Sequence, residues 1–264
     1  YADINIEFEN WKKNFKKLAL SKDISEETFN IAIENTRYLP NVIKYDRYQP
    51  EFYEDTRTYI GKRATQKKLK MGINLFSQNK KFINNIENEY SVEKELLLSL
   101  MAIETNYGNY LGKMDIISSL ATLSFDKRRS EFFSNELLIA LKLIDRQLIN
   151  PDLLYGSWAG AFGNFQFMPS TIKNYAIDYN NNSNIELKKI EDSFASAANY
   201  INKIGWKKNS HCFYKVDLND KISKKYLNVS AKKLINKKKL RYFKKFIKNK
   251  EKLDFIDETL KVAI

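Results

Sequence analysis

The sequence predicts a mainly α-helical protein. The chain has 8 Gly and 4 Pro among 264 residues, far fewer than the roughly 12% that average usage would give, so turns should be few. Hydrophobic residues make up 43% of the chain, enough to bury a substantial core in one large domain or two small ones. Apolar residues also recur at helical spacing in several segments.

The elements expected before residue 90 are helices at 4–20 and 25–35, an extended connector between Pro40 and Pro50, and further helical structure over 51–87. Ser25 is a suitable N-cap for the second helix, because its hydroxyl can accept a bond from a free backbone N–H of the first turn. The apolar positions of the last segment include Phe52, Tyr59, Ile60 and Leu69.

The next helix carries a carboxylate among its apolar residues. It is expected to begin at Ser91 and to stop at Gly108. Its inward face consists of positions i, i+3, i+4 and i+7, which are Leu97, Leu100, Met101 and Glu104. Glu104 is therefore expected on the buried side of the helix.

A carboxylate at that position should have a raised pKa. Burial disfavours its charged form, and the last helical turn places it against the negative end of the helix dipole. A raised pKa suits a general acid near neutral pH. On helix position alone, the alternative is a structural Glu104 in a salt bridge.

A stretch rich in small residues follows some fifty residues later. Residues 156–170 read GSWAGAFGNFQFMPS and contain three of the eight Gly. Small residues allow close approach of the backbone to another surface. That surface is either a neighbouring helix or an extended ligand.

The composition excludes several chemistries. The single Cys212 cannot form an internal disulfide, and the single His211 cannot supply a multi-histidine metal site. We interpret His211 as an ordinary surface histidine. The longest apolar run, 96–103, is far shorter than the roughly 20 residues of a membrane-spanning helix, so we expect no transmembrane segment.

The positive charge is concentrated at the C-terminus. Residues 1–206 hold 27 basic and 26 acidic side chains, whereas residues 207–264 hold 18 and 6. Apolar residues spaced by three and four within 231–252 predict a basic amphipathic helix, centred on Lys237–Lys245. One interpretation is a helix that attaches the protein to a polyanion. The other is a solvated helix face, which we favour slightly.

Several motifs extend in order over most of the chain. They are DRYQPEF (46–52), AIETNYG (102–108), LATLSFDKRRSEFF (120–133), GSWAGAFGNFQFMPS (156–170), YAID (175–178) and ANYINKIGW (198–206). Together they resemble the lytic murein transglycosylase B family (membrane-bound lytic transglycosylase B-like). Its members have a lysozyme-like catalytic core, so the resemblance implies that core together with an additional N-terminal helical region.

The resemblance implies cleavage of the β-1,4 bond between N-acetylmuramic acid (MurNAc) and N-acetylglucosamine (GlcNAc) in peptidoglycan, without water, leaving a 1,6-anhydro end. Glu104 would act alone as acid and then base. The other site positions that it implies are Ser157 and Gln166 for sugar hydrogen bonds, Phe167 and Met168 for the groove wall, Tyr200 and Tyr59 for ring stacking, and Arg128 and Arg129 for the glycan or its peptide stem.

Oxygen-bearing side chains alternate at Asp178, Asn180, Asn182 and Asn184, as in a calcium loop. An EF-hand would need Gly at position 183 and Glu at 189, where this chain has Ser and Lys. In the family that this chain resembles, the loop is closed by an acidic residue further along the chain. The corresponding residue here is Asp192. We therefore expect either a weak structural calcium loop or a plain Asn-rich turn, and no cofactor for the chemistry.

The predicted organisation is a helical N-terminal region (1–88), a lysozyme-like core (89–206) and a divergent basic segment (207–264). A final family motif with Tyr and Asn has no recognisable counterpart before Ile264. The alternatives to the lyase are a hydrolytic muramidase and a non-catalytic polyanion-binding or cell-wall-binding module. The substrate predicts that the protein acts in the periplasm of a Gram-negative bacterium, either free or associated with the outer membrane. We also expect a monomer and no nucleic-acid partner.

Overall fold

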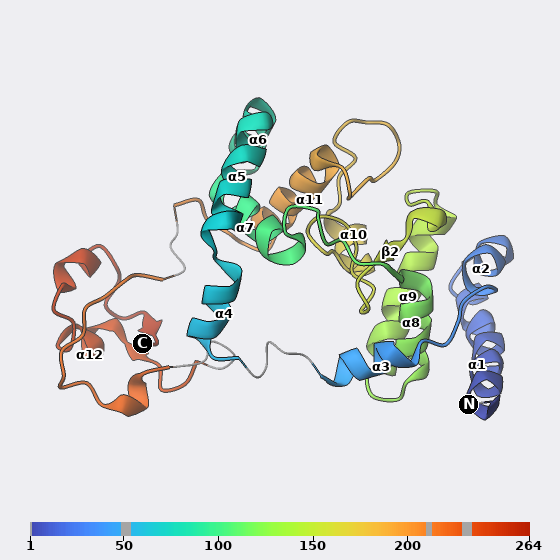
Figure 1. Cartoon of the computed structure of the whole chain (residues 1–264), viewed down its shortest axis with the longest axis horizontal. Coiled ribbons are helices and arrows are strands. Elements are labelled where there is room, and N and C mark those ends of the chain that lie inside the picture. Colours follow the sequence, from blue (N-terminus) through green and yellow to red (C-terminus); the bar gives the residue numbers. More distant parts are fainter. Residues whose placement is uncertain (1, 49–53, 210–212, 229–233) are drawn as a thin grey trace. The chain divides into compact units, whose positions relative to one another are not determined.

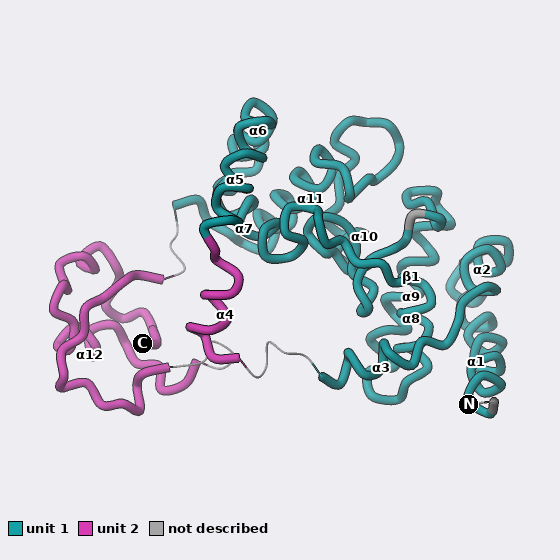
Figure 2. The backbone as a smooth tube through the Cα atoms, viewed as in Figure 1, with its two compact units in different colours: residues 1–48, 66–209 teal, residues 49–65, 210–264 magenta. Residues whose placement is uncertain are grey.

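The computed structural model describes residues 2–48, 54–209, 213–228 and 234–264, and the chain forms two compact units (Figure 2). Unit 1 comprises residues 1–48 and 66–209, and unit 2 comprises residues 49–65 and 210–264. These units group the chain differently from the predicted three segments, whose boundaries at 88 and 206 stay predictions. Pro50, Phe52, His211 and Cys212 lie outside the described residues.

Unit 1 is built almost entirely of helices (Figure 1). Its helices are α1 (Ala2–Leu20), α2 (Glu26–Ile33), α3 (Pro40–Arg47), α5 (Gln66–Gln78), α6 (Lys80–Tyr90), α7 (Lys94–Thr105), α8 (Ile116–Phe125), α9 (Ser130–Asp145), α10 (Pro169–Tyr175) and α11 (Ile190–Lys203). A 3₁₀ helix (Pro151–Leu153) precedes strand β2 (Tyr155–Gly156), which pairs antiparallel with β1 (Met114–Asp115). Among the described residues, no helix has the length and apolarity that crossing a membrane requires.

Helix α8 is the central helix of unit 1, because its residues 116–124 are all buried. It packs along α9. Two of its hydroxyl groups, those of Ser118 and Thr122, accept backbone N–H groups of Arg37 and Leu39 at 3.1 and 3.0 Å. The buried helix thus holds the segment that leads into α3.

One carboxylate fastens the N-terminal helices to the core. Ser25 is the N-cap of α2, as predicted, and its hydroxyl accepts the N–H of Thr28 at 3.1 Å. The hydroxyls of Ser25 and Thr28 both donate to Asp145, the last residue of α9. These bonds hold the pKa of the Asp145 carboxyl below its usual value.

Three predicted element boundaries differ from the structure. Pro40 starts helix α3 instead of an extended connector, because proline at the first helical position has no N–H to lose. Ser91 is not the N-cap of the next helix; it ends α6 in a left-handed conformation (φ 54°), and α7 begins at Lys94. Helix α7 stops at Thr105, three residues before Gly108.

Unit 2 contains short elements and a small core of its own, which is built from side chains within residues 216–264. The elements are α4 (Thr56–Arg63), a 3₁₀ helix (Lys224–Tyr226), β3 (Lys238–Lys239), α12 (Leu240–Lys244), a 3₁₀ helix (Lys250–Leu253) and β4 (Lys261–Val262). The fully or nearly buried side chains are Tyr226, Leu240, Phe243, Ile247 and Leu253.

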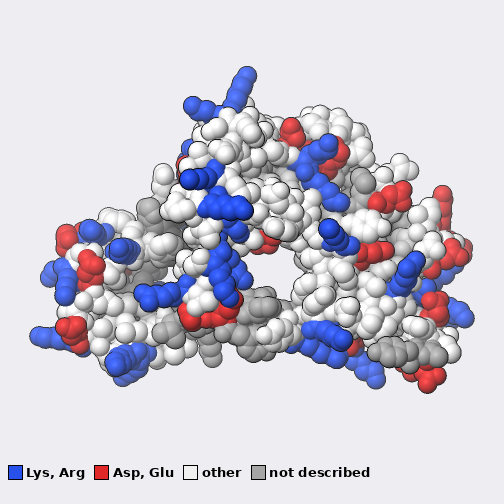
Figure 3. All heavy atoms as spheres, in the orientation of Figure 1, with Lys and Arg blue, Asp and Glu red and all other residues white. Residues whose placement is uncertain are grey.

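The predicted basic amphipathic helix over 231–252 was therefore wrong. Within its described part, the only α-helix is the five-residue α12. The apolar residues that suggested one helix face instead converge on this core from turns and short helices, so tertiary packing overrides their periodicity. Lys238 and Lys239 lie on β3, exposed, and Lys239 is directly opposite Lys261 of β4. Figure 3 shows Lys and Arg side chains as separate groups on the visible surface of unit 2, with some Asp and Glu among them.

Candidate active site

Glu104 lies at the last turn of α7, where the chain reverses direction. The next residues, Asn106, Tyr107 and Gly108, all have positive φ values of 50°, 59° and 81°. Such backbone is uncommon for residues other than glycine and is found disproportionately at functional sites. The reversal leaves the Glu104 side chain at the end of the helix and not along its length.

Glu104 is exposed as a residue, yet protein atoms around its carboxyl raise the pKa of that group by desolvation. The raised pKa agrees with the sequence prediction, whereas the predicted burial was wrong. Leu97 and Met101 are buried and Leu100 is half-buried, but Glu104 itself is exposed by surface area. Both observations fit a carboxyl that a substrate can reach and that still holds its proton at higher pH than a free glutamate.

A buried hydrogen bond joins the end of α7 to the glycine-rich segment. The Thr105 hydroxyl donates to the carbonyl oxygen of Asn164 at 2.8 Å and accepts the N–H of Gly108 at 3.0 Å. Thr105 and Asn164 are almost completely buried. The Asn164 side chain in turn donates to the Ser193 hydroxyl at 3.0 Å on α11. Glu104 is thereby fixed, through its neighbour, to a second and a third element.

The glycine-rich segment makes a tight turn that carries Gln166. Phe162 and Phe167 exchange backbone hydrogen bonds at 2.9 and 2.8 Å and close the turn. Gln166 adopts a left-handed conformation (φ 52°), and its amide donates to the carbonyls of Gly163 at 2.9 Å and Leu111 at 3.3 Å. The amide oxygen of Gln166 is the end of this side chain that remains for a ligand.

The remaining candidates on this segment lie close to one another in the fold. The Ser157 hydroxyl accepts the N–H of Ala161 at 3.0 Å, and its own proton can still be donated. Phe167 is buried and packs edge-to-face on Tyr200 of α11, with ring centroids 5.7 Å apart. Met168 is half-buried at the N-cap position of α10. The structure thus groups Ser157, Gln166, Phe167, Met168 and Tyr200 around one turn.

The glycines of this segment serve packing within the chain. A Cβ on Gly156 would lie 2.2 Å from the Ala161 carbonyl oxygen, and one on Gly163 would lie 2.5 Å from the Leu187 Cβ. Gly160 leaves room for Leu120 of α8. Of the two interpretations of the small residues, close packing accounts for these three positions.

Arg128 and Arg129 both pair with Asp46, a carboxylate that is almost completely buried on α3. The Arg128 Nε atom lies 3.4 Å from Asp46, and the guanidinium of Arg129 also stacks on the Phe133 ring at 4.8 Å. These contacts join α3 to the turn between α8 and α9. They give a structural reason for Asp46 in the motif DRYQPEF and for the two arginines in LATLSFDKRRSEFF. Contact of Arg128 and Arg129 with a glycan stays a prediction.

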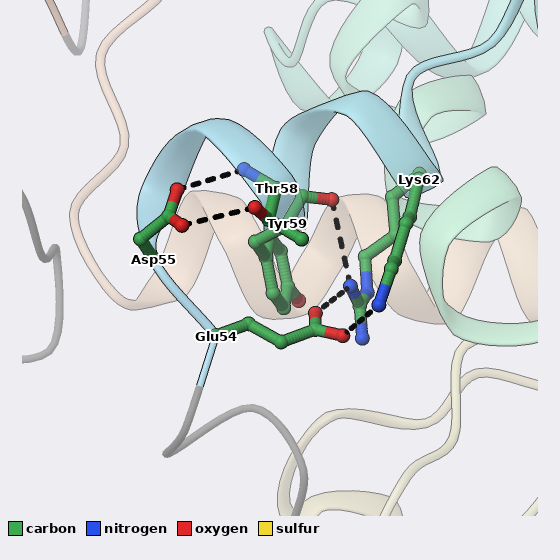
Figure 4. Close-up of polar contacts among 6 residues, drawn as sticks. Glu54, Asp55, Thr58, Tyr59 and Lys62 are labelled. Carbon is green, nitrogen blue, oxygen red and sulfur yellow. Dashed lines mark hydrogen bonds and ion pairs between the residues drawn. The ribbon is translucent and has the colours of Figure 1, made fainter.

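Tyr59 belongs to unit 2, on α4. Its ring face is covered by the Arg63 guanidinium, 3.6 Å from the ring centroid, and Arg63 is held by Glu54 at 2.9 Å. Figure 4 shows Glu54 reaching along the helix to Lys62, and Asp55 capping the helix at Thr58. Arg63 occupies one face of the Tyr59 ring, and stacking of Tyr59 on a sugar also stays a prediction.

The Asn-rich loop is closed by its own hydrogen bonds. The two oxygens of the buried Asp192 accept the N–H groups of Tyr179 and Glu186 at 3.0 and 2.8 Å. Those of Asp178 accept the N–H groups of Asn182 and Ser183 at 3.1 and 2.7 Å. In the part of the chain that the structure describes, no three His, Cys, Asp or Glu side chains form a metal-binding group.

Sequence reasoning missed the residues that support Glu104. Thr105 and Asn164 lie inside the motifs AIETNYG and GSWAGAFGNFQFMPS, and Lys68 of α5 lies in no motif. None of the three was singled out, because the sequence does not show which groups a polar side chain contacts. Lys68 donates from Nζ to the Ala102 carbonyl at 2.7 Å. The weak signal that was present is a Thr directly after the candidate acid, at the end of an apolar helix.

Comparison with known proteins agrees with this arrangement. A sequence model of the transglycosylase SLT domain matches residues 7–260. The chain belongs to this family. Membrane-bound lytic murein transglycosylase B of Escherichia coli (strain K12) is 37% identical to it over 151 residues, which are 57% of this chain and 42% of that protein.

Solved structures of family members match the fold. SltB3 from Pseudomonas aeruginosa in complex with NAG-anhNAM-pentapeptide matches with a TM-score of 0.81 and 29% identity, over 90% of this chain and 63% of that one. Escherichia coli Slt35 in complex with calcium matches with a TM-score of 0.67 and 31% identity, over 76% and 64%. The predicted helical, lysozyme-like fold is confirmed. The chain spans less than two thirds of the length of these relatives.

Proposed function

We propose that this protein is a lytic transglycosylase that cleaves the MurNAc–GlcNAc β-1,4 bond of peptidoglycan without water. The observation that carries the proposal is the placement of Glu104, an exposed residue whose carboxyl has a raised pKa. The hydrogen bond of the adjacent Thr105 fixes this end of α7 to the turn that bears Gln166. Family membership supports it, as does the likeness to a structure with an anhydro-muropeptide bound.

In the proposed reaction Glu104 performs two proton transfers. It first protonates the glycosidic oxygen as the bond from that oxygen to C1 of MurNAc breaks. The C6 hydroxyl oxygen of the same sugar then bonds to C1, and its proton passes to Glu104, which is regenerated. Ser157 and Gln166 would hold the sugar by hydrogen bonds, while Phe167, Met168 and Tyr200 would form the apolar side of the site.

A hydrolytic muramidase is the alternative, and it would need a second carboxylate. Of the three acids that follow Glu104 most closely in the sequence, Asp115, Asp126 and Glu131, two have structural roles. Asp115 caps α8 through the Ser118 N–H at 2.9 Å, and Asp126 pairs with Arg47 at 2.9 Å. Their engagement favours the single-acid reaction. The substrate would place the protein in the periplasm of a Gram-negative bacterium, acting as a monomer on glycan strands.

The products of digestion test this proposal. Purified murein treated with the protein should yield anhydro-muropeptides by mass spectrometry, because the C6 hydroxyl replaces water as the attacking group. Reducing-end muropeptides alone would support the muramidase instead. Binding to murein without any cleavage would support the non-catalytic cell-wall-binding module.

Replacing the candidate acid tests its role. Glu104→Gln removes the transferable proton and keeps the size, so turnover should fall by roughly 10² to 10⁴, while glycan binding persists. Because the first step needs protonated Glu104 and desolvation raises the pKa of this group, wild-type kcat/KM should decline as the pH rises through that raised pKa. Glu95→Gln, at an exposed position in the first turn of α7, is the matched control. Near-normal turnover of Glu104→Gln would refute the assignment.

The Asn-rich loop supports a second, minor proposal, that of a weak structural calcium site. Asp178, Asn180, Asn182, Asn184 and Asp192 supply oxygen atoms of the kind that calcium prefers. Only Asp178 and Asp192 are carboxylates, and both already accept backbone N–H groups. The loop therefore holds its shape without an ion, and any affinity should be low.

Calcium should stabilise the fold only slightly. For a Kd on the order of 1 mM, about 5 mM calcium adds about 1 kcal/mol to the free energy of unfolding, or about 2–4 °C in melting temperature. Asp178→Asn should abolish the shift, and equal magnesium should not reproduce it. An unchanged melting temperature in calcium would identify the loop as a plain turn.

A further inference from the structure

Helix α5 contacts the last turn of α7 and the chain reversal that follows it, at one point on either side of Glu104 in the sequence. The first contact is the bond from Lys68 Nζ to the Ala102 carbonyl oxygen at 2.7 Å. That carbonyl also accepts the N–H of Asn106, which ends the helix, at 3.2 Å. Lys68 thus places a positive charge at the negative end of the α7 dipole.

The second contact is one turn further along α5, at Gly72. A Cβ on this buried glycine would lie 2.4 Å from the Tyr107 hydroxyl oxygen and 3.1 Å from Cζ of the same ring. The phenol of Tyr107 therefore lies directly against the backbone of α5. Glycine inside a helix is normally unfavourable, and this close approach gives it a reason. By contrast, a Cβ on Gly61 of α4 would meet no atom within 4 Å from any described residue beyond its own helix.

We infer that Lys68 and Gly72 are positioning residues for Glu104. Ala102 and Tyr107 flank the candidate acid, and α5 holds both. Thr105, between them, is held by Asn164 on the 162–167 turn. The last turn of α7 is therefore fixed by two separate elements, and neither Lys68 nor Gly72 needs to touch the substrate.

This inference rests on the proposed function, because it assigns α5 a part in placing the acid of that reaction. Proton transfer requires the carboxyl within hydrogen-bond reach of the glycosidic oxygen. A displacement of about 1 Å at a reacting group can lower turnover by about 10²-fold. Loosening the Lys68 contact should therefore change kcat more than the affinity for the glycan.

The kinetic test compares three lysine variants on a soluble glycan fragment. Lys68→Met removes the donor and keeps the length, and kcat should fall by roughly 10-fold or more with KM within about two-fold. Lys68→Arg can still donate to the Ala102 carbonyl and should restore most of kcat. Lys70→Met, at an exposed position on the same helix, should behave as wild type. The inference would be overturned if kcat fell equally in Lys68→Met and Lys70→Met, or if Lys68→Arg did not restore kcat.

Gly72→Ala provides a second variant, with Gly61→Ala as its control for helix propensity. The added methyl at position 72 must displace Tyr107, so kcat should fall as in Lys68→Met, whereas Gly61→Ala should leave it unchanged. Wild-type kcat in folded Gly72→Ala would contradict the proposed role of Gly72.

A spectroscopic measurement separates this inference from the proposed function. The ¹³C carboxyl signal of Glu104, assigned by its loss in Glu104→Gln, should move in Lys68→Met and Gly72→Ala and stay in place in Lys70→Met. The signal does not depend on catalysis, so it is informative even if wild-type protein cleaves no murein, a result that would refute the proposed function alone. An unmoved signal in folded Lys68→Met would refute the positioning role.

Discussion

The hydrogen bond from the Thr105 hydroxyl to the Asn164 carbonyl is the contact on which the candidate active site depends. Both groups are buried, so removing the Thr105 hydroxyl would take this donor away from the buried Asn164 carbonyl, at a cost of about 1–3 kcal/mol. The same hydroxyl accepts the Gly108 N–H and so fixes the chain reversal after α7. One side chain thereby sets the position of Glu104 relative to the turn that carries Gln166.

Close backbone packing makes that arrangement rigid. Asn164 donates from its backbone N–H to the Leu187 carbonyl at 2.8 Å, next to the point where Gly163 meets Leu187. Gly112 similarly lies against the backbone of Gly156, where a Cβ would be 2.0 Å from a carbonyl oxygen. With no room for a side chain at these points, the segments cannot separate or shift without losing buried contacts. Polar groups mounted on such a frame keep the geometry that proton transfer requires.

Much of the fold could be predicted because it follows from local rules. The Ser25 cap, the helical core and the Glu104 helix all depend on short-range patterns. The errors share a physical cause, which is that the deciding contact is distant in sequence. The periodic residues of 231–252 pack around Tyr226 and Leu253 instead of forming one helix face, and Arg128 and Arg129 find Asp46 some eighty residues away. The exposure of Glu104 likewise depends on how the chain turns after Thr105, and Lys68 and Asn164 are recognisable only from their partners.

The most direct test of this account is the turnover of Thr105→Val compared with that of Thr105→Ser on the same soluble glycan, in protein shown to be folded. Valine keeps the shape of threonine and removes the hydroxyl, so its turnover should fall by at least about 10-fold through misplacement of Glu104. Serine keeps the hydroxyl and should retain turnover within a few-fold of wild type. Wild-type turnover in folded Thr105→Val would contradict the claim that this hydrogen bond positions the catalytic acid.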